Sequence, residues 1–220
     1  MAERLHASWG FSPGQDAPLG RRREDIAALD HLGVGYRHGR FLDVIYRKAP
    51  DGQWLVGGDQ RPAVRRQLPE SDGDLISEIK DDIKSLIEEF EPTVLATCVA
   101  IGNHIDHKIT RAAALLAASE KDIPIRLWQD LPYAADVLDM PELPKGLQLG
   151  LPHLGLVGPE AQERKFQAVQ QYASQISMLN GSKKDLFTKL EEHARGLAPD
   201  GGYAETTWPV IRYGDSENQA

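Results

Sequence analysis

Two histidines and a carboxylate stand close together in the stretch GNHIDHKIT, residues 102–110. His104 and His107 are three residues apart, so on the first turn of a helix they share one face. Imidazole and carboxylate groups, together with one open position, are the ligands of a metal ion that activates water. Asp106 can hold one imidazole in a single tautomer by accepting its ring proton. The stretch therefore indicates either half of a metal site or the polar start of a helix.

An apolar run over residues 93–100 comes directly before this stretch and is bounded by Pro92 and Gly102. A continuous apolar run of this length is typical of a strand that is covered on both faces, as in a parallel sheet. Ligands of such sheets bind outside the carboxyl ends of the strands. We therefore expect residues 101–107 to face a ligand-binding crevice. Asp130 either lines the same crevice or caps a turn.

Apolar residues at helical spacing alternate with short apolar runs along the chain, which is typical of an α/β layered fold. The pattern predicts helices over residues 21–32, 75–90, 107–119, 159–179 and 184–195, and strands over 41–47, 93–100 and 123–128. Gly33 marks the end of the first helix. Two long connections, 49–73 and 131–158, are rich in turn formers, so we interpret them as irregular.

The composition limits the class of protein. With 220 residues, 41% of them hydrophobic, the chain can bury the core of one globular domain. The formal net charge of −8 argues against nonspecific binding to nucleic acid, which needs an excess of Lys and Arg. No stretch reaches the roughly 18 apolar residues of a membrane span, and the first residues lack the apolar core of a signal peptide, so we expect a cytoplasmic protein. Cys98 is the only cysteine, which excludes an internal disulfide, and its apolar surroundings predict burial.

Several segments between Arg21 and Trp208 together resemble the PIG-L (LmbE-like) family of zinc-dependent N-deacetylases, and they follow the order of that family. GNHIDH resembles the family's His-x-Asp-His signature, and LWQDLPYA is similar to its aromatic-x-Asp-x-Pro-Tyr stretch. The other matching segments are the helix RRREDIAALDHLGV, the segment FLDVIYR, the late helix KFQAVQQYASQISML and the C-terminal stretch AETTWP.

The resemblance implies roles for individual residues. His107 would ligate a zinc ion, and His104 would stabilise the developing oxyanion while Asp106 orients it. Arg21 and Asp43 would contact hydroxyl groups of an N-acetylated sugar conjugate. The implied fold is a Rossmann-like three-layer α/β sandwich with a mostly parallel sheet. The implied activity is hydrolysis of the acetamide on an amino sugar.

One motif of the family does not occur in these 220 residues. Family members carry a first strand followed by a His-Pro-Asp-Asp type motif, which supplies the other zinc ligands and the general base. The resemblance therefore implies an N-terminally incomplete domain over residues 1–213 that lacks its first strand, a polar tail over 214–220 and an incomplete zinc site. An unpaired sheet edge favours a homo-oligomer. The alternatives are a non-catalytic sugar-binding or partner-binding member of the same fold, and another activity in the same crevice.

Overall fold

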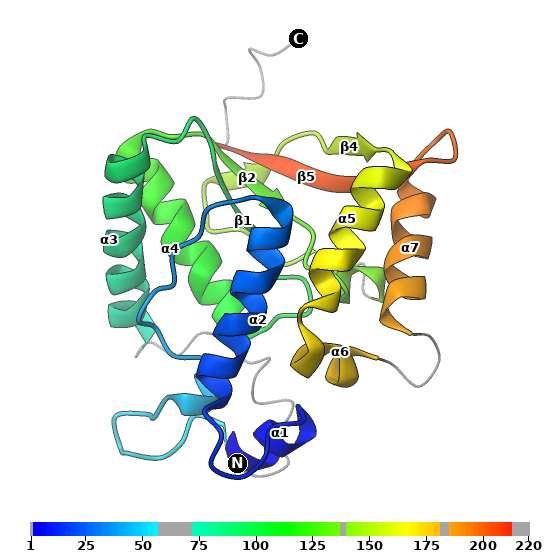
Figure 1. Cartoon of the computed structure of the whole chain (residues 1–220). Helices are drawn as coiled ribbons and strands as arrows, with labels where there is room; N and C mark the ends of the chain where they lie inside the picture. The colour runs from blue at the N-terminus through cyan, green and yellow to red at the C-terminus, as the bar shows by residue number, and fades with distance from the viewer. Residues whose placement is uncertain (1, 57–71, 137–139, 181–184, 213–220) are drawn as a thin grey trace. The chain divides into compact units, whose positions relative to one another are not determined.

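Figure 1 shows the computed structural model of the chain, which describes residues 2–56, 72–136, 140–180 and 185–212. The helices of this mixed α/β protein are α1 (Ala2–Ser8), α2 (Ala17–Leu32), α3 (Gly73–Phe90), α4 (Ile105–Lys121), α5 (Pro159–Gln170), α6 (Ala173–Leu179) and α7 (Leu186–Leu197). The strands are β1 (Leu95–Cys98), β2 (Ile125–Trp128), β3 (Leu147–Leu149), β4 (His153–Val157) and β5 (Tyr203–Arg212). Among the described residues, no helix combines the length and the apolar character that a membrane span requires.

The chain divides into two compact units. The first unit comprises Met1–Tyr46 and Leu156–Ala204, and the second comprises Arg47–Gly155 and Glu205–Ala220. The single domain over residues 1–213 stays a prediction. The predicted polar tail, 214–220, lies outside the described residues.

The sheet joins β1, β2, β5 and β3 in that order, and β4 pairs with β5. β1 and β2 run parallel with Thr97 opposite Leu127, and α4 is the crossover helix that such a pair requires. β5 is antiparallel to both β2 and β3. The predicted α/β class is confirmed, but the described strands do not make a mostly parallel sheet. The difference is due to β5, for which the apolar pattern predicts no strand. β5 runs antiparallel to its neighbours β2 and β3.

The core of the second unit contains side chains from β1, β2, α4 and the turn after β1. Ile101, Ile105 and Leu127 are among its fully buried side chains. Ala113 and Ala117 on α4 have no exposed surface, and such small side chains allow neighbouring elements to approach the helix closely. α3 lies beside α4 (Figure 1). The Ala-rich sequence of α4 therefore explains how one helix packs against both β1 and α3.

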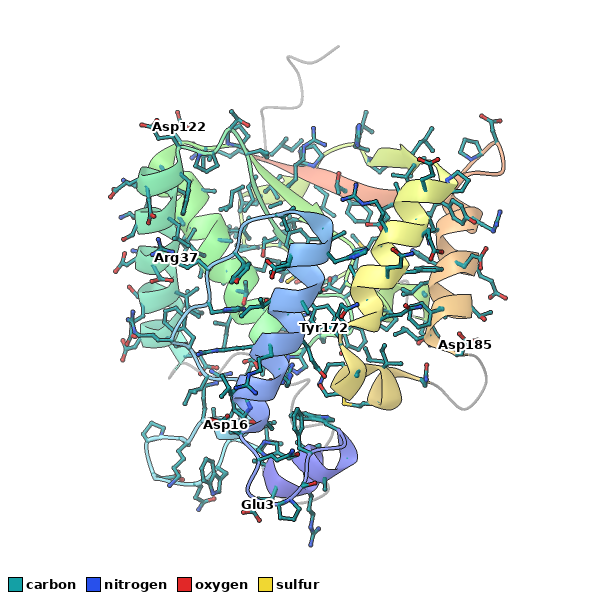
Figure 2. All side chains as sticks on the ribbon, viewed as in Figure 1. Glu3, Asp16, Arg37, Asp122, Tyr172 and Asp185 are labelled. Carbon is teal, nitrogen blue, oxygen red and sulfur yellow. The ribbon has the colours of Figure 1, made fainter. Side chains whose placement is uncertain are left out.

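The first unit is built around α2 and α5, which contact each other. α2 begins at Asp16, whose carboxylate accepts the N–H of Leu19 at 2.9 Å, and it ends at Gly33 with a φ of 71°. Figure 2 shows Asp16 at the start of α2 and Tyr172 beside the helix. The Tyr172 hydroxyl donates to Asp25 at 2.5 Å. Gly33 thus ends the helix as the sequence predicts, because glycine adopts the left-handed conformation without strain.

Three local predictions are wrong. Residues 41–47 do not form a strand; they contain a short 3₁₀ helix over Val44–Tyr46, in which the carboxylate of Asp43 accepts the N–H of Ile45 at 3.2 Å. The connection 131–158 is not irregular throughout, since β3 and β4 lie within it. The predicted helix 159–179 is two helices, α5 and α6. In each of these stretches, local capping or a long-range strand pairing outweighs the apolar spacing.

Candidate functional site

The turn between β1 and α4 has an unusual backbone. Ala100, Gly102 and Asn103 have φ angles of 69°, 83° and 61°. This left-handed conformation costs roughly 1–2 kcal/mol in a residue other than glycine. A Cβ added at Gly102 would lie 3.3 Å from the Cβ of Tyr133, a tight contact that Tyr133 would have to relieve by a small shift. The turn leads directly into His104, the N-cap of α4, and thereby holds the predicted site residues at the carboxyl end of β1.

His104 is fixed by the start of α4. Its Nδ1 accepts the backbone N–H of Asp106 at 3.2 Å, which is the N-cap hydrogen bond of the helix. A neutral imidazole that accepts at Nδ1 carries its proton on Nε2. The backbone N–H of Asp106 therefore orients His104, whereas the sequence predicted that Asp106 holds an imidazole by accepting its ring proton.

His107 lies one helical turn further and is held by Asp130. Its Nδ1 lies 2.6 Å from Asp130 Oδ1, and Asp130 Oδ2 accepts the N–H of Ile101 at 2.9 Å. The His107 side chain is 33% exposed, whereas that of Asp130 is 1% exposed. The ring centroids of His107 and His104 are 5.1 Å apart. The two histidines are thus neighbours on one face, as their spacing predicts, and His107 is not packed into the interior.

Cys98 completes a cluster with His107 and Asp130. One ligand atom from each residue lies within 4.8 Å of the other two. The Cys98 thiol donates to the backbone carbonyl of His107 at a distance of 3.5 Å. Burial, and after it the charge of Asp130, raise the pKa of Cys98 to about 12. Cys98 is therefore a buried, protonated thiol near neutral pH in the metal-free chain, as its apolar surroundings predict.

The carboxylate of Asp106 is paired with a buried arginine. Arg47 donates from Nη2 to Asp106 Oδ1, and its Nη1 lies 3.5 Å from Asp72 Oδ1. The side chains of Arg47, Asp72 and Asp106 are 11%, 7% and 26% exposed. Among the described residues, Arg47 Nε and Asp72 Oδ2 are buried without a hydrogen-bond partner. Arg47 therefore links the residues before α3 to the first turn of α4.

The donor atoms around His107 fit a zinc ion in part. Asp130 already occupies Nδ1, which leaves Nε2 as the ring nitrogen available to a metal. His104 presents a second imidazole beside it. A catalytic zinc site needs three protein ligands, usually histidines and a carboxylate, and an open position. The described residues supply one clear ligand, His107, so further ligands are needed for a complete site.

Arg21 and Asp43 lie in the first unit, whereas His104, Asp106 and His107 lie in the second. Arg21 Nη1 lies 3.5 Å from Asp43 Oδ2, and both side chains are about one-third exposed, at 34% and 32%. The Arg21 guanidinium also lies over the ring of Trp9, 4.9 Å from its centroid. The structure therefore brings Arg21 and Asp43 together, and their contact with a sugar stays a prediction.

A cavity of about 310 Å³ surrounds this pair. Its lining mixes charged side chains with the aromatic rings of Phe41, Tyr46 and Tyr172. Burial, and after it the charge of Asp43, raise the pKa of Tyr46, and burial with the hydrogen bond to Asp25 raises the pKa of Tyr172. Both phenols therefore stay protonated, and the Tyr172 hydroxyl donates its proton to Asp25. Sugars are commonly bound by such a combination of hydrogen-bonding groups and apolar rings.

A larger cavity, of about 710 Å³, lies elsewhere in the second unit. It is lined by the C-terminal half of α4, the amino end of β2, and apolar residues such as Leu147 and Val210. His104, His107 and Asp130 are not part of its lining. Cavity size therefore does not identify the chemical site in this unit; the ionisable groups at the carboxyl ends of β1 and β2 do.

Sequence reasoning missed the roles of Asp130 and Arg47. Asp130 follows β2 just as the GNHIDH stretch follows β1, and the carboxyl ends of two paired parallel strands lie side by side. That relation was a usable signal for Asp130. Arg47 is 59 residues away from Asp106 and lies outside any regular element, so no local pattern indicates it.

Comparison with known proteins agrees with this geometry. A family model described as "PIG-L: GlcNAc-PI de-N-acetylase" matches residues 6–118. The zinc-inhibited form of the teicoplanin deacetylase Orf2 is 56% identical, covering 97% of this chain and 82% of that chain, with a TM-score of 0.91. A deacetylase–teicoplanin complex from teicoplanin biosynthesis is 53% identical, over 97% and 81% of the two chains, with a TM-score of 0.87. The A40926 pseudoaglycone deacetylase Dbv21 is 58% identical, over 96% and 78%, with a TM-score of 0.83. No curated protein matches the chain.

Proposed function

Because the chain belongs to the PIG-L family of de-N-acetylases, we propose that it takes part in zinc-dependent removal of an acyl group from the nitrogen of an amino sugar. The substrate class is a sugar carried on a glycopeptide, since the similar solved structures are deacetylases of teicoplanin and of the A40926 pseudoaglycone. The observation that carries the proposal is the pair His104 and His107, whose rings lie 5.1 Å apart at the carboxyl end of β1.

His107 would hold the zinc ion through Nε2, since Asp130 occupies its Nδ1. When zinc is bound, it supplies polarisation of the amide carbonyl and a water of lowered pKa. The His-Pro-Asp-Asp motif, which provides the other ligands and the general base in the family, does not occur in these 220 residues. A complete catalytic site therefore needs groups in addition to those described.

His104 is the group that we assign to the oxyanion. Its Nδ1 accepts a backbone N–H, so the neutral ring offers an N–H donor at Nε2. A donor held in place before the reaction stabilises negative charge on the former carbonyl oxygen without reorganisation. Loss of one such donor typically lowers kcat by about 10² to 10³. Asp106 orients His104 through its backbone N–H, and its carboxylate forms an ion pair with Arg47.

Arg21 and Asp43 are the residues that we propose to bind the sugar hydroxyls. A sugar hydroxyl both accepts and donates hydrogen bonds. The guanidinium of Arg21 can donate to it, and the carboxylate of Asp43 can accept from it. The aromatic rings in the lining of the 310 Å³ cavity support a sugar ligand over a purely ionic one. Residues 57–71 of the long connection 49–73 lie outside the described residues, and this proposal does not depend on them.

The finer fold that we propose is a Rossmann-like arrangement with a further strand beside β1. β1 ends the path β1-β2-β5-β3 and pairs on one side only among the described strands. An edge strand that is buried along part of its length presents unpaired N–H and C=O groups, which a further strand or a second copy of the chain would satisfy. This edge is also the reason to propose a homo-oligomer.

The test combines zinc content with amine release. The full chain is incubated with zinc and a glycopeptide that bears an N-acetylglucosamine, and the free amine is measured. Because His107 is the one clear ligand that the described residues supply, we expect weak zinc binding, which His107→Ala should weaken further; His104→Ala should keep the zinc affinity but slow amine release by about 10² to 10³. His153→Ala, at an exposed histidine of β4 in the same unit, is the matched control and should change neither.

A non-catalytic sugar-binding protein is the second candidate, because the described residues supply one clear zinc ligand, His107. Saturable binding of the glycopeptide without zinc and without amine release would support this candidate and would refute the hydrolase. Loss of that binding in Arg21→Met would then locate it in the first unit.

A further inference from the structure

Asp130 is the more deeply buried of the two carboxylates, Asp106 and Asp130, beside the histidines. It lies directly after β2, and its side chain is 1% exposed. Oδ2 accepts the N–H of Ile101, in the turn after β1, and Oδ1 lies 2.6 Å from His107 Nδ1. One side chain thus ties the carboxyl end of β2 to the turn after β1 and to the first turn of α4. Each carboxylate oxygen therefore has a hydrogen-bond partner.

We propose that Asp130 is a positioning residue, which accepts the Nδ1 proton of His107 and so presents the unprotonated Nε2 to zinc. An ionised carboxylate is only an acceptor, so a contact of 2.6 Å to a ring nitrogen requires the proton on that nitrogen. The neutral ring then has its lone pair on Nε2, on a side chain that is 33% exposed. This inference rests on the proposed function, because it concerns the residue that would hold the metal.

A rival arrangement places the ion inside the cluster of Cys98, His107 and Asp130, with His107 Nδ1 as a ligand. The distances argue against it. Two ligand atoms at 2.0–2.2 Å from a tetrahedral zinc ion lie about 3.3–3.6 Å apart. His107 Nδ1 and Asp130 Oδ1 are 2.6 Å apart, which is a hydrogen-bond distance. The Cys98 thiol, moreover, is directed at the carbonyl of His107. In this arrangement the cluster orients the imidazole, because Asp130 and not a metal engages His107 Nδ1.

The experiment uses the full chain with ¹⁵N-labelled histidine, without zinc, and the variant Asp130→Asn. An asparagine can keep the contact to Ile101 through its carbonyl oxygen, but it then turns an N–H donor toward His107. We expect the wild-type ring to carry its proton on Nδ1 and the variant ring to carry it on Nε2, as the ¹⁵N shifts of the imidazole report. The ¹⁵N signals of the His107 ring are assigned as those that disappear in His107→Gln. A proton on Nε2 in the wild-type chain would overturn the inference, whatever the stability of the variant.

Zinc affinity, measured by competition with a chelator, is the second readout. Asp130→Asn should weaken binding by about 10- to 100-fold, which is typical for loss of the group that orients a ligand. Cys98→Ala is the matched control and should leave the affinity within about twofold, because Cys98 is not a ligand in this arrangement. An equal loss in Cys98→Ala and Asp130→Asn would overturn the inference in favour of a metal inside the cluster.

The two readouts also separate this inference from the proposed function. If the wild-type chain binds no zinc, the proposed hydrolase fails as an activity of this chain. The protonated nitrogen of His107 is still measured in the zinc-free protein, and a proton on Nδ1 that moves in Asp130→Asn supports the positioning role of Asp130.

Discussion

Arg47 offers the sharpest test of how the second unit supports its histidines. It is a guanidinium with 11% exposure, between the carboxylates of Asp72 and Asp106. Replacing it with methionine keeps most of the side-chain volume and removes the charge. Asp72, only 7% exposed, would then be a buried carboxylate without a counter-ion. We expect Arg47→Met to destabilise the chain strongly for this reason.

The magnitude follows from distance and burial. Two unit charges 3.5 Å apart attract by about 5 kcal/mol at an effective dielectric constant of about 20, and desolvation offsets part of this. Removing one partner of a buried pair costs about 3–5 kcal/mol. Asp106 is 26% exposed, so water can partly replace its partner. We therefore expect Arg47→Met to lower the free energy of unfolding by about 3 kcal/mol, the low end of this range.

Urea denaturation at pH 7 measures this change as a shift of the midpoint at constant slope. The matched control is Lys48→Met, which removes one positive charge from the neighbouring, exposed position and should cost about 0.5 kcal/mol, including its contact with Trp54. Arg47→Met combined with Asp72→Asn should recover at least about 1 kcal/mol, because no buried carboxylate is then unpaired. The reasoning is refuted if Arg47→Met costs no more than Lys48→Met, or if the double variant recovers nothing.

Three further predictions concern pH, reactivity and the turn. Hydrogen bonds from Lys84 and Lys80 hold the pKa of Glu120 below its usual 4.5. These ion pairs therefore stabilise the fold fully above about pH 4.5, where Glu120 is ionised in both the folded and the unfolded chain. The stabilisation is lost as the pH falls through the lower pKa of the folded state. The stability difference between wild type and Glu120→Gln, measured by thermal unfolding, should therefore shrink below pH 4.5. The Cys98 thiol, with a pKa of about 12, should react far more slowly with iodoacetamide at pH 7 in the folded chain than in urea. Gly102→Ala should cost at least about 1–2 kcal/mol in urea denaturation, because its φ is 83° and the added methyl group would meet Tyr133.

Each of these predictions has a result that contradicts it. A pH-independent difference for Glu120→Gln would mean that the α3–α4 ion pairs do not stabilise the fold. Equal labelling rates of Cys98 in the folded and unfolded chain would contradict its burial. Gly35→Ala is the control for the turn, since nothing lies within 4 Å of its added Cβ. Gly102→Ala should be clearly less stable than Gly35→Ala.

The elements that a short stretch of sequence can specify were predictable. The apolar stripe of α3, the run that forms β1 and the glycine that ends α2 depend on spacing and local conformation. The pairing of His104 with His107 on one face follows equally from a separation of three residues in a helix. The family, too, could be inferred from the sequence, because its motifs lie in order along the chain.

The partners of these side chains were decided only by the tertiary structure. Asp130 reaches His107 across 23 residues because β1 and β2 are parallel neighbours whose carboxyl ends meet. Arg47 reaches Asp106 across 59 residues, and β5 enters the sheet antiparallel to β2 from the far end of the chain. Local periodicity reports which face of an element is apolar. The pairing of charged residues depends on how segments that are distant in the sequence pack together. The spacing of residues along the chain does not specify that packing.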